Sequence, residues 1–357
     1  MSKRMSLPLL PDFDAQRLCL IKPSALGDVV QTLPLLTALR KRWPEAHISW
    51  VIKKSLADLL VGHPHLDEIV TYDDSTRGMQ YALTLAGLWL RLRRTPYDLA
   101  IDMQGLLRSG GMAVASRAPR RVGYSIAREG ARYAYTDPIE VPTLQMPAMS
   151  RYWLVAQALG IESGVAPADL GLTAEQRQWA TDQIRHLPRP ILAVHPGAKW
   201  QTKRWPAEHF AELCRRAVQT HNAGILLLGG SETAPECGRI ESSLGDRVVN
   251  LAGRTTLRQL ASLSAVADAF LSCDSGPMHL AAAVGTPVVS VFTCTSTLRA
   301  APYGDAHRAV ATSVDCAASY LRTCPHLKCM SELTPDRVWP ALDSTLNEAM
   351  QSPAAAA

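Results

Sequence analysis

Short apolar runs alternate along the chain with segments in which apolar residues recur every three or four positions. The runs are typical of buried strands, and the 3.6-residue spacing is typical of amphipathic helices. This alternation predicts parallel sheets whose strands are connected by helices. The predicted strands are residues 17–22, 47–52, 98–102, 224–228, 247–251, 268–272 and 287–292, with one more beginning at Ile191. The predicted helices are residues 28–43, 55–61, 79–94, 152–159, 206–219, 255–267, 277–284 and 334–350.

The alternation stops near the middle of the chain, after Asp137. Residues 138–147 contain three prolines, which continue neither a helix nor a central strand. A chain of 357 residues is also long for one domain, since domains usually hold ~100–200 residues. We therefore predict two doubly wound α/β domains, residues 1–160 and 161–357, that face one another across a central cleft. For the helix of residues 334–350, packing back onto the first domain is left open.

The composition allows a large core, because 47% of the residues are apolar and only 19% are charged. The longest apolar stretches, residues 81–90 and 223–228, are shorter than the ~18 residues that span a membrane, and the chain starts without a signal-peptide pattern. We therefore expect a cytoplasmic protein whose eight cysteines are reduced. Cys316, Cys324 and Cys329 lie close together in the sequence but match no common zinc pattern, so metal binding there is left open.

Positive charge is concentrated in the first half of the chain. Residues 1–160 hold 20 Lys and Arg against 14 Asp and Glu, whereas residues 161–357 hold 17 against 18. Ten arginines and only three acids lie between Arg77 and Arg132. This excess predicts either a surface for a polyanion, such as a phosphorylated lipid or an acidic sugar, or an ordinary solvated face. Nucleic acid is not an expected partner, because no aromatic stacking positions lie among these arginines.

The predicted helix of residues 79–94 combines apolar residues with three arginines near its end. As a crossover helix it is first interpreted as part of the core. Leu83, Trp89 and Leu90 together with the arginines also suggest contact with an anionic membrane surface. Both interpretations are kept.

Ligands of open α/β sheets bind beyond the carboxyl ends of the strands, so the loops that follow strands are the places to search for chemistry. The loop of residues 22–28 follows the first predicted strand. Gly27 is expected to permit a tight turn there, and Asp28 is either a general base or a helix cap.

The loop of residues 196–206 has small residues, three cations and no acid. The backbone N–H groups of Gly197 and Ala198, with the charges of Lys199, Lys203 and Arg204, predict a site for an anion such as a diphosphate. The two tryptophans of this loop are expected to pack in the core.

A third loop, residues 273–279, leads from a strand into an alanine-rich helix with a proline in its first turn. The hydroxyl of Ser275 and the N–H groups of Ser275 and Gly276 are expected to point at a phosphate along the helix axis. In the alternative interpretation Asp274 and Ser275 are helix caps and His279 is an ordinary polar residue.

Several familiar sites are missing from the sequence. No Gly-x-x-x-x-Gly-Lys-Ser/Thr loop and no Gly-x-Gly-x-x-Gly after a strand is found, which argues against P-loop and nicotinamide enzymes. The only Asp-x-Asp pair, Asp12 and Asp14, precedes the first strand and so lies at the wrong end of the sheet for a metal–diphosphate site. We expect neither a metal nor a cofactor.

Four segments of the chain resemble the ADP-heptose:lipopolysaccharide heptosyltransferases, glycosyltransferase family 9. The likeness runs from about residue 17 to residue 350, and its segments follow one another in the right order. They are residues 21–34, 97–109, 203–206 and 274–279, and residues 324–330 look like a tail found in many members.

The resemblance implies a GT-B fold of two Rossmann-like domains, the first binding the acceptor and the second the nucleotide-sugar. It implies metal-independent, inverting transfer of a heptose from ADP-heptose to a lipopolysaccharide acceptor, Kdo-lipid A or a heptosylated core. Asp28 is then the catalytic base and Lys203 steadies the diphosphate. The remaining assignments are Gly197, Ala198, Asp274, Ser275, Gly276 and His279 for the donor, and Ser24, Gly27, Gln104 and Arg108 for the acceptor.

Such an acceptor would place the protein at the inner face of the inner membrane, where a peripheral contact is expected. Two alternatives remain open: a GT-B glycosyltransferase with another sugar or a protein acceptor, and a nucleotide-sugar-binding module without catalysis. Which heptose is added and the oligomeric state do not follow from the sequence.

Overall fold

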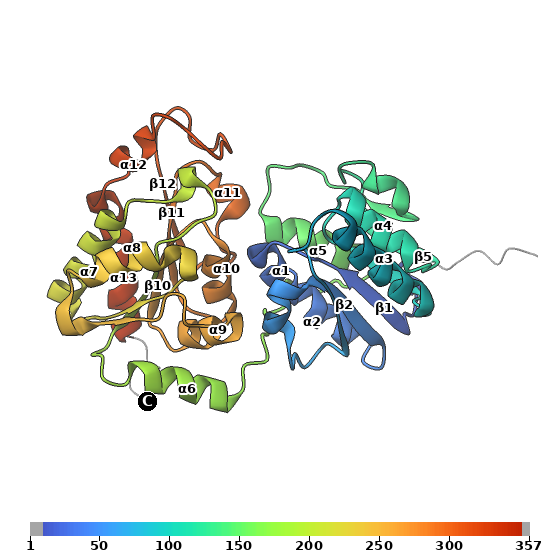
Figure 1. Ribbon diagram of the computed structural model, residues 1–357, viewed down its shortest axis with the longest axis horizontal. Helices are drawn as coiled ribbons and strands as arrows, with labels where there is room; N and C mark the ends of the chain where they lie inside the picture. The colour runs from blue at the N-terminus through green and yellow to red at the C-terminus, as the bar shows by residue number, and fades with distance from the viewer. Residues whose placement is uncertain (1–9, 352–357) are drawn as a thin grey trace, which may run out of the picture. The chain divides into compact units, whose positions relative to one another are not determined.

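The structure, a computed structural model, describes residues 10–351 and divides into two compact units that meet in the sequence at Gly171 and Leu172 (Figure 1). Residues 161–171 belong to the N-terminal unit, not to the C-terminal one as predicted. Two hydrogen bonds attach this segment there: Trp153 Nε1 donates to the Ser163 carbonyl at 3.1 Å, and His63 Nε2 lies 2.6 Å from the Asp169 carbonyl oxygen.

The N-terminal domain contains a six-stranded parallel sheet in the order β3-β2-β1-β4-β5-β6. This is the strand order of a doubly wound Rossmann-like fold. The strand order reverses between β1 and β4: β2 and β3 are added on one side of β1, and β4, β5 and β6 on the other. The strands are β1 (Arg17–Ile21), β2 (His47–Lys53), β3 (Glu68–Tyr72), β4 (Leu99–Asp102), β5 (Arg120–Tyr124) and β6 (Asp137–Ile139).

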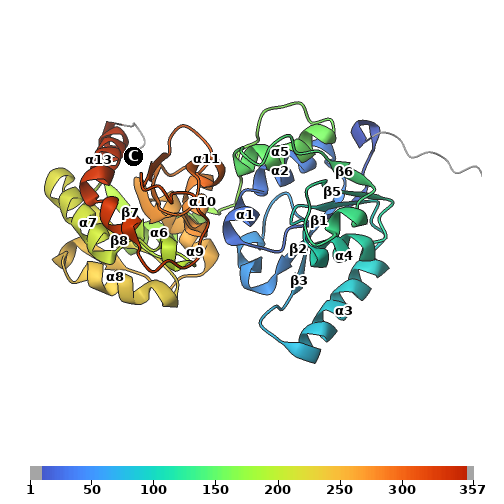
Figure 2. The same cartoon turned by 90° about the horizontal axis from the view of Figure 1, so that it is seen from above.

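Helices cover both faces of this sheet. In Figure 2, α2 and α5 lie on one side of the strands and α3 and α4 on the other. The helices are α1 (Leu26–Val30), α2 (Leu33–Arg42), α3 (Gly78–Arg94), α4 (Leu107–Ala115) and α5 (Ala148–Ala158), with short 3-10 turns η1 (Leu10–Asp12), η2 (Lys54–Leu60) and η3 (Ala131–Ala134).

The prediction of one helix over residues 28–43 is wrong, because the segment forms two helices. α1 ends at Val30 and α2 begins at Leu33 with Pro34 in its first turn. Proline has no N–H for the preceding turn and its ring clashes with that turn, but it fits the start of a new helix. The Thr32 hydroxyl bridges the break by donating to the Asp28 carbonyl at 2.8 Å.

The C-terminal domain repeats this architecture. Its parallel sheet has the order β12-β11-β10-β7-β8-β9, which is the same doubly wound order counted from the domain's own first strand. The strands are β7 (Ile191–His195), β8 (Gly224–Leu227), β9 (Val248–Asn250), β10 (Ala269–Cys273), β11 (Val288–Phe292) and β12 (Arg308–Ala311). The helices are α6 (Ala174–Ile184), α7 (Ala207–His221), α8 (Ala234–Glu241), α9 (Leu257–Ala265), α10 (Gly276–Ala283), α11 (Thr297–Ala300), α12 (Lys328–Glu332) and α13 (Pro335–Gln351), with 3-10 turns η4 (Gln201–Lys203), η5 (Ser231–Thr233) and η6 (Gly245–Arg247).

Alternate residues of the second sheet form a core with α7, α8 and α13. Leu192 and Val194 of β7 point to this face, since side chains of a strand alternate between the two faces of a sheet. Val338, Leu342 and Leu346 of α13 belong to the same core and are fully buried. The C-terminal helix thus packs on its own domain. No helix within residues 10–351 is long and apolar enough to cross a membrane.

One glycine makes a close approach in the second domain. A Cβ atom on Gly224 would lie 2.7 Å from both Leu187 Cβ and the Pro188 carbonyl oxygen, whereas a Cβ on Gly238 in α8 would meet nothing within 4 Å. We expect Gly224→Ala to lower the free energy of unfolding by about 1–3 kcal/mol through overpacking. Gly238→Ala, the matched control, should raise it by up to about 1 kcal/mol, because alanine favours the helix. Urea unfolding of both variants measures the difference; a wild-type midpoint for Gly224→Ala would contradict the prediction.

Candidate active site

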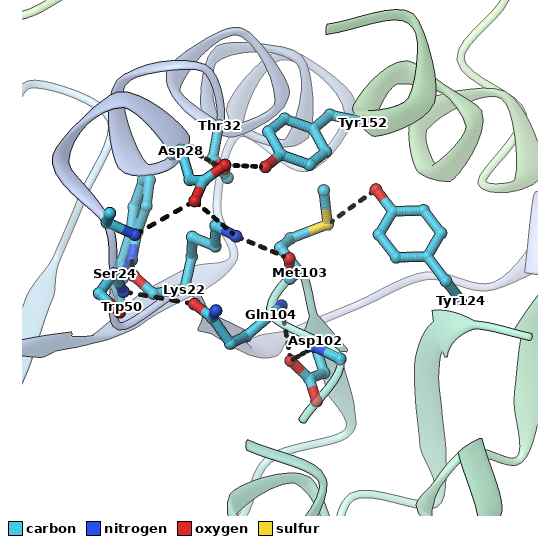
Figure 3. A network of polar contacts seen from close by, with 12 residues as sticks. Lys22, Ser24, Asp28, Thr32, Trp50, Asp102, Met103, Gln104, Tyr124 and Tyr152 are labelled. Carbon is cyan, nitrogen blue, oxygen red and sulfur yellow. Dashed lines mark hydrogen bonds and ion pairs between the residues drawn. The ribbon is translucent and has the colours of Figure 1, made fainter. Parts of the chain in front are cut away.

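Asp28 lies just beyond the carboxyl end of β1, in the first turn of α1, and its carboxylate is held from both sides (Figure 3). The hydroxyl of Tyr152 donates to Oδ1 at 2.6 Å, and the N–H of Ala25 donates to Oδ2 at 3.2 Å. The Ala25 contact is a helix-capping bond, so the cap interpretation is confirmed. The carboxylate is nevertheless 41% exposed, so the cap leaves it within reach of a substrate.

The ammonium group of Lys22 lies behind this carboxylate. Lys22 Nζ is 3.8 Å from Asp28 Oδ2, donates to the Met103 carbonyl at 3.0 Å, and is 5.3 Å from the ring centre of Tyr152. The lysine side chain is only 4% exposed. Burial lowers the pKa of Lys22, and the negative charge of Asp28 acts in the opposite direction.

The loop after β4 completes this side of the site. The Asp102 carboxylate is fully buried and accepts hydrogen bonds from the N–H groups of Gln104 and Gly105 at 2.8 and 3.1 Å and from the Tyr135 hydroxyl at 2.8 Å. Burial raises the pKa of Asp102, and these donors oppose the rise. The turn that results places Gln104 Oε1 3.4 Å from the N–H of Ser24, so two of the predicted acceptor residues come together.

The other two predicted acceptor residues are placed differently. Gly27 is a buried residue of α1 with helical backbone, so the tight turn predicted for it is not formed. Arg108 lies in a separate cluster, where its guanidinium donates to the Tyr81 hydroxyl and sits 5.9 Å from the ring centre of Tyr72.

In the second domain the loops after β7 and β10 meet at an ion pair. Lys203 Nζ is 2.6 Å from Asp274 Oδ2, and the Thr295 hydroxyl donates to the same oxygen. The loop of residues 196–206 has no acid of its own, but Asp274 from the neighbouring loop supplies one. Asp274 is therefore an ion-pair partner and not the helix cap of the alternative interpretation.

Three other residues of the loop of residues 196–206, called the basic loop from here on, close the loop, pack in the core or lie beside cations. Arg204 Nε donates to the Ala198 carbonyl at 2.7 Å and so closes the loop on itself. Trp205 is buried and donates from Nε1 to the Leu333 carbonyl at 2.7 Å, which confirms its prediction as a core residue. Trp200 is only half-buried, and the cationic groups of Lys203 and Arg322 lie 4.6 and 5.2 Å from its ring centre.

Unpartnered polar atoms lie at the carboxyl edge of this second sheet. Ser275 occupies the N-cap position of α10, yet its Oγ is buried and forms no hydrogen bond within residues 10–351, so the predicted cap bond is absent. His195 Nδ1, at the end of β7, is likewise without a partner among the described residues. Burial lowers the pKa of His195 to about 4, which keeps the ring neutral near pH 7. These atoms are positioned to be satisfied by a bound molecule.

Gly197 and the half-buried Ala198 follow His195, and a Cβ on Gly197 would lie 2.4 Å from Thr233 Oγ1. Glycine is therefore required where this loop meets the turn after β8. On α10, Gly276 opens the helix and His279 is half-buried one turn later.

Sequence reasoning missed three residues of these networks: Lys22, Tyr152 and Thr295. A lysine that directly follows four buried strand residues is a signal that was available for Lys22. Tyr152 and Thr295 lie 124 and 21 positions from the acids they contact, and nothing in the local sequence points to those partners.

The cysteines do not form a recognisable metal site. Within residues 10–351, no group of three or more His, Cys, Asp or Glu side chains is placed to hold an ion. All eight cysteines are free; Cys316 is exposed, Cys324 is half-buried and Cys329 is buried. Cys19, Cys214 and Cys273 are fully buried, as predicted for packing residues.

Two Rossmann-like domains, each with charged side chains at the edge where its strand order reverses, define the GT-B class of glycosyltransferase fold. A model of glycosyltransferase family 9 (heptosyltransferase) matches residues 85–330, and the chain belongs to this family. It is a heptosyltransferase enzyme of the class that acts in lipopolysaccharide biosynthesis.

Known relatives match most of the chain. It is 29% identical to the lipopolysaccharide heptosyltransferase 1 of Pseudomonas aeruginosa, over 92% of this chain and 98% of the relative. It is 27% identical to the lipopolysaccharide core heptosyltransferase OpsX of Haemophilus influenzae, over 81% and 82%. The fold matches the Escherichia coli heptosyltransferase WaaC solved with ADP at a TM-score of 0.74 and 22% identity, over 92% of this chain and 99% of that one.

Proposed function

We propose that this enzyme transfers a heptose from ADP-heptose to the core of lipopolysaccharide by an inverting mechanism in which Asp28 is the general base. The observation that carries the proposal is the Asp28 carboxylate, exposed at the carboxyl edge of the first sheet while the groups that hold it, Lys22 and Tyr152, are buried. A base needs this arrangement, because it must be fixed in direction and still reach a substrate hydroxyl.

The donor is inferred from the relatives and from the second domain. The WaaC structures were solved with ADP and with ADP-2-deoxy-2-fluoro heptose. The start of α10, the Ser275 hydroxyl, which has no hydrogen-bond partner in the described part of the chain, and the ammonium of Lys203 offer donors and positive charge to a diphosphate. We infer that these groups neutralise the leaving ADP, so that the reaction proceeds without a metal or a further cofactor.

Asp28, Lys203 and the start of α10 account for the proton and the charge that move in the reaction. An acceptor hydroxyl gives its proton to Asp28 while the oxygen of that hydroxyl attacks the anomeric carbon of the heptose. The bond from that carbon to the diphosphate oxygen breaks, and ADP leaves with its electron pair. Attack opposite the leaving group inverts the configuration at this carbon. Developing negative charge on ADP is stabilised by Lys203 and the amide groups at the start of α10.

A lipid-linked acceptor places the reaction at a membrane surface, and the relatives are named for lipopolysaccharide. The cytoplasmic location predicted from the sequence remains a prediction. Ser24 in the Asp28 loop and Gln104 beside it are the proposed acceptor contacts. Arg108 lies in a separate cluster, and we assign it to a more distant part of the acceptor.

Asp28→Asn tests the base. We expect kcat to fall by ~10²–10⁴-fold, because asparagine keeps the size of the side chain and one accepting oxygen but takes no proton from the substrate. ADP release from ADP-heptose with a truncated core acceptor measures the rate, and thermal unfolding checks the fold. Turnover within a few-fold of wild type would remove Asp28 from the mechanism. A wild-type protein that binds ADP-heptose but transfers nothing to any core acceptor would favour the binding-module alternative.

Tyr152→Phe tests the positioning of the base. The lost hydrogen bond to the carboxylate should lower kcat ~10-fold and leave KM for both substrates nearly unchanged, since only the direction of the base is affected. Tyr124→Phe is the matched control: its hydroxyl is also buried, but it donates to the Arg151 carbonyl at 3.2 Å. The same hydroxyl lies 3.8 Å from the Met103 sulfur and makes no contact with Asp28 (Figure 3). Equal losses of kcat in both variants would show a general packing effect and would overturn the positioning role.

Lys203→Met tests the diphosphate contact. We expect the affinity for ADP to fall at least ~10-fold, because a charge-assisted hydrogen bond is lost, and the affinity for adenosine to stay nearly constant. The substitution also leaves the buried Asp274 carboxylate without its ion-pair partner, which destabilises the domain. The double variant Lys203→Met with Asp274→Asn removes the unpaired negative charge as well and should still bind ADP weakly. ADP affinity is measured by calorimetric titration. A wild-type affinity in the double variant would show that the ion pair has only a structural role.

A further inference from the structure

Helix α3 is apolar on both its inner and its outer side. On the inner side Leu88 and Leu92 are buried in the core of the N-terminal domain. On the outer side Met79, Leu83 and Leu90 are 77%, 65% and 54% exposed. At ~100° per residue, these three side chains fall within about 40° of one another and form a stripe about 16 Å long. We call Met79, Leu83 and Leu90 the outer stripe of α3; the helix itself is seen at the rim of its domain in Figure 2.

Positive charge borders the outer stripe. Arg93 and Arg94 are exposed at the end of α3, and the exposed Arg77 stands at its N-cap position. Among residues 10–351, none of these three arginines has an ion-pair partner, and the sequence has no acid between residues 75 and 97. Arginines at a helix C-terminus are favoured by the helix dipole, but a cation at the N-terminus is not. Arg77 therefore requires another explanation.

A tryptophan lies beside the stripe. Trp89 is 44% exposed and rests against α4, where a Cβ on Gly111 would lie 2.9 Å from its Cζ2 atom. Tryptophan is enriched where an apolar environment meets water, because its ring is apolar and its N–H is polar. Apolar side chains bordered by arginine and tryptophan are the combination found on helices that lie in a membrane interface.

We propose that the outer stripe of α3 docks on an anionic phospholipid bilayer. The helix lies along the surface with the stripe in the interface, and Arg77, Arg93 and Arg94 contact lipid phosphates. A second copy of the chain fits this face poorly, since two such faces would bring like charges together. This inference goes beyond the proposed reaction and does not depend on its chemistry.

Vesicle sedimentation tests the proposal with the full chain. Vesicles of phosphatidylglycerol and phosphatidylcholine are compared with vesicles of phosphatidylcholine alone, at low and high salt. We expect binding to the anionic vesicles that weakens with salt. Arg93→Gln with Arg94→Gln should lower the partition coefficient ~25-fold, at about fivefold for each arginine near the surface. Leu83→Ser with Leu90→Ser should also lower it at least ~10-fold.

Matched controls come from the other domain. Arg177→Gln with Arg185→Gln removes two exposed arginines in the α6 region, and Leu298→Ser removes a leucine that is 54% exposed, as Leu90 is. Neither control should change vesicle binding. Transfer to a soluble truncated acceptor should stay at the wild-type rate in the α3 variants, which separates this inference from the proposed reaction.

Three results would overturn the proposal. The first is wild-type vesicle binding in both α3 double variants, and the second is absence of binding to anionic vesicles by the unmodified protein. The third is a dimer in analytical ultracentrifugation that the Leu83→Ser with Leu90→Ser variant abolishes, which would assign the stripe to a second copy of the chain.

Discussion

The pairing of β1 with β4 determines where the chemistry of the N-terminal domain lies. In a doubly wound sheet these two strands are neighbours although many residues separate them, and their connections leave in opposite directions. The register pairs Ile21 with Asp102, so the loops that follow start side by side. Lys22 then reaches the Met103 carbonyl and Ser24 reaches Gln104. The same pairing recurs between β7 and β10, where it brings the basic loop next to Asp274.

Both edges contain a lysine and an aspartate, but the two pairs present opposite charges. In the first domain Lys22 is 4% exposed and Asp28 is 41% exposed, so a carboxylate faces the solvent. In the second domain Lys203 is 17% exposed and Asp274 only 7%, so the ammonium is the more accessible group. A buried ion without a partner is costly, which explains why each buried charge is paired with the more accessible charge beside it. The first pair suits a proton acceptor and the second suits an anionic leaving group.

The sequence predicted the central strands well because consecutive apolar residues make up most of each one. All eight predicted strands exist, and β7, β10 and β11 are buried at every position. The strands β3, β5, β6 and β12 were missed because polar residues, glycine or proline interrupt them, as Arg120, Arg121 and Gly123 do in β5 and Pro138 does in β6. The loops of the site were found from their positions after strands. Partners such as Tyr152 were not, because they depend on contacts between distant segments.

Comparison of α3 with α7 shows what packing alone requires of a helix on such a sheet. α7 has 15 residues and buries a single face that includes Phe210, Leu213 and Cys214. α3 has 17 residues and buries only Leu88 and Leu92. The interpretation of α3 as a core helix therefore accounts for these two leucines and not for the apolar residues on its outer side. Exposed apolar stripes lower solubility and add nothing to the core. Packing in the domain therefore does not account for the outer stripe of α3, which lies beside arginines that have no ion-pair partner among the described residues.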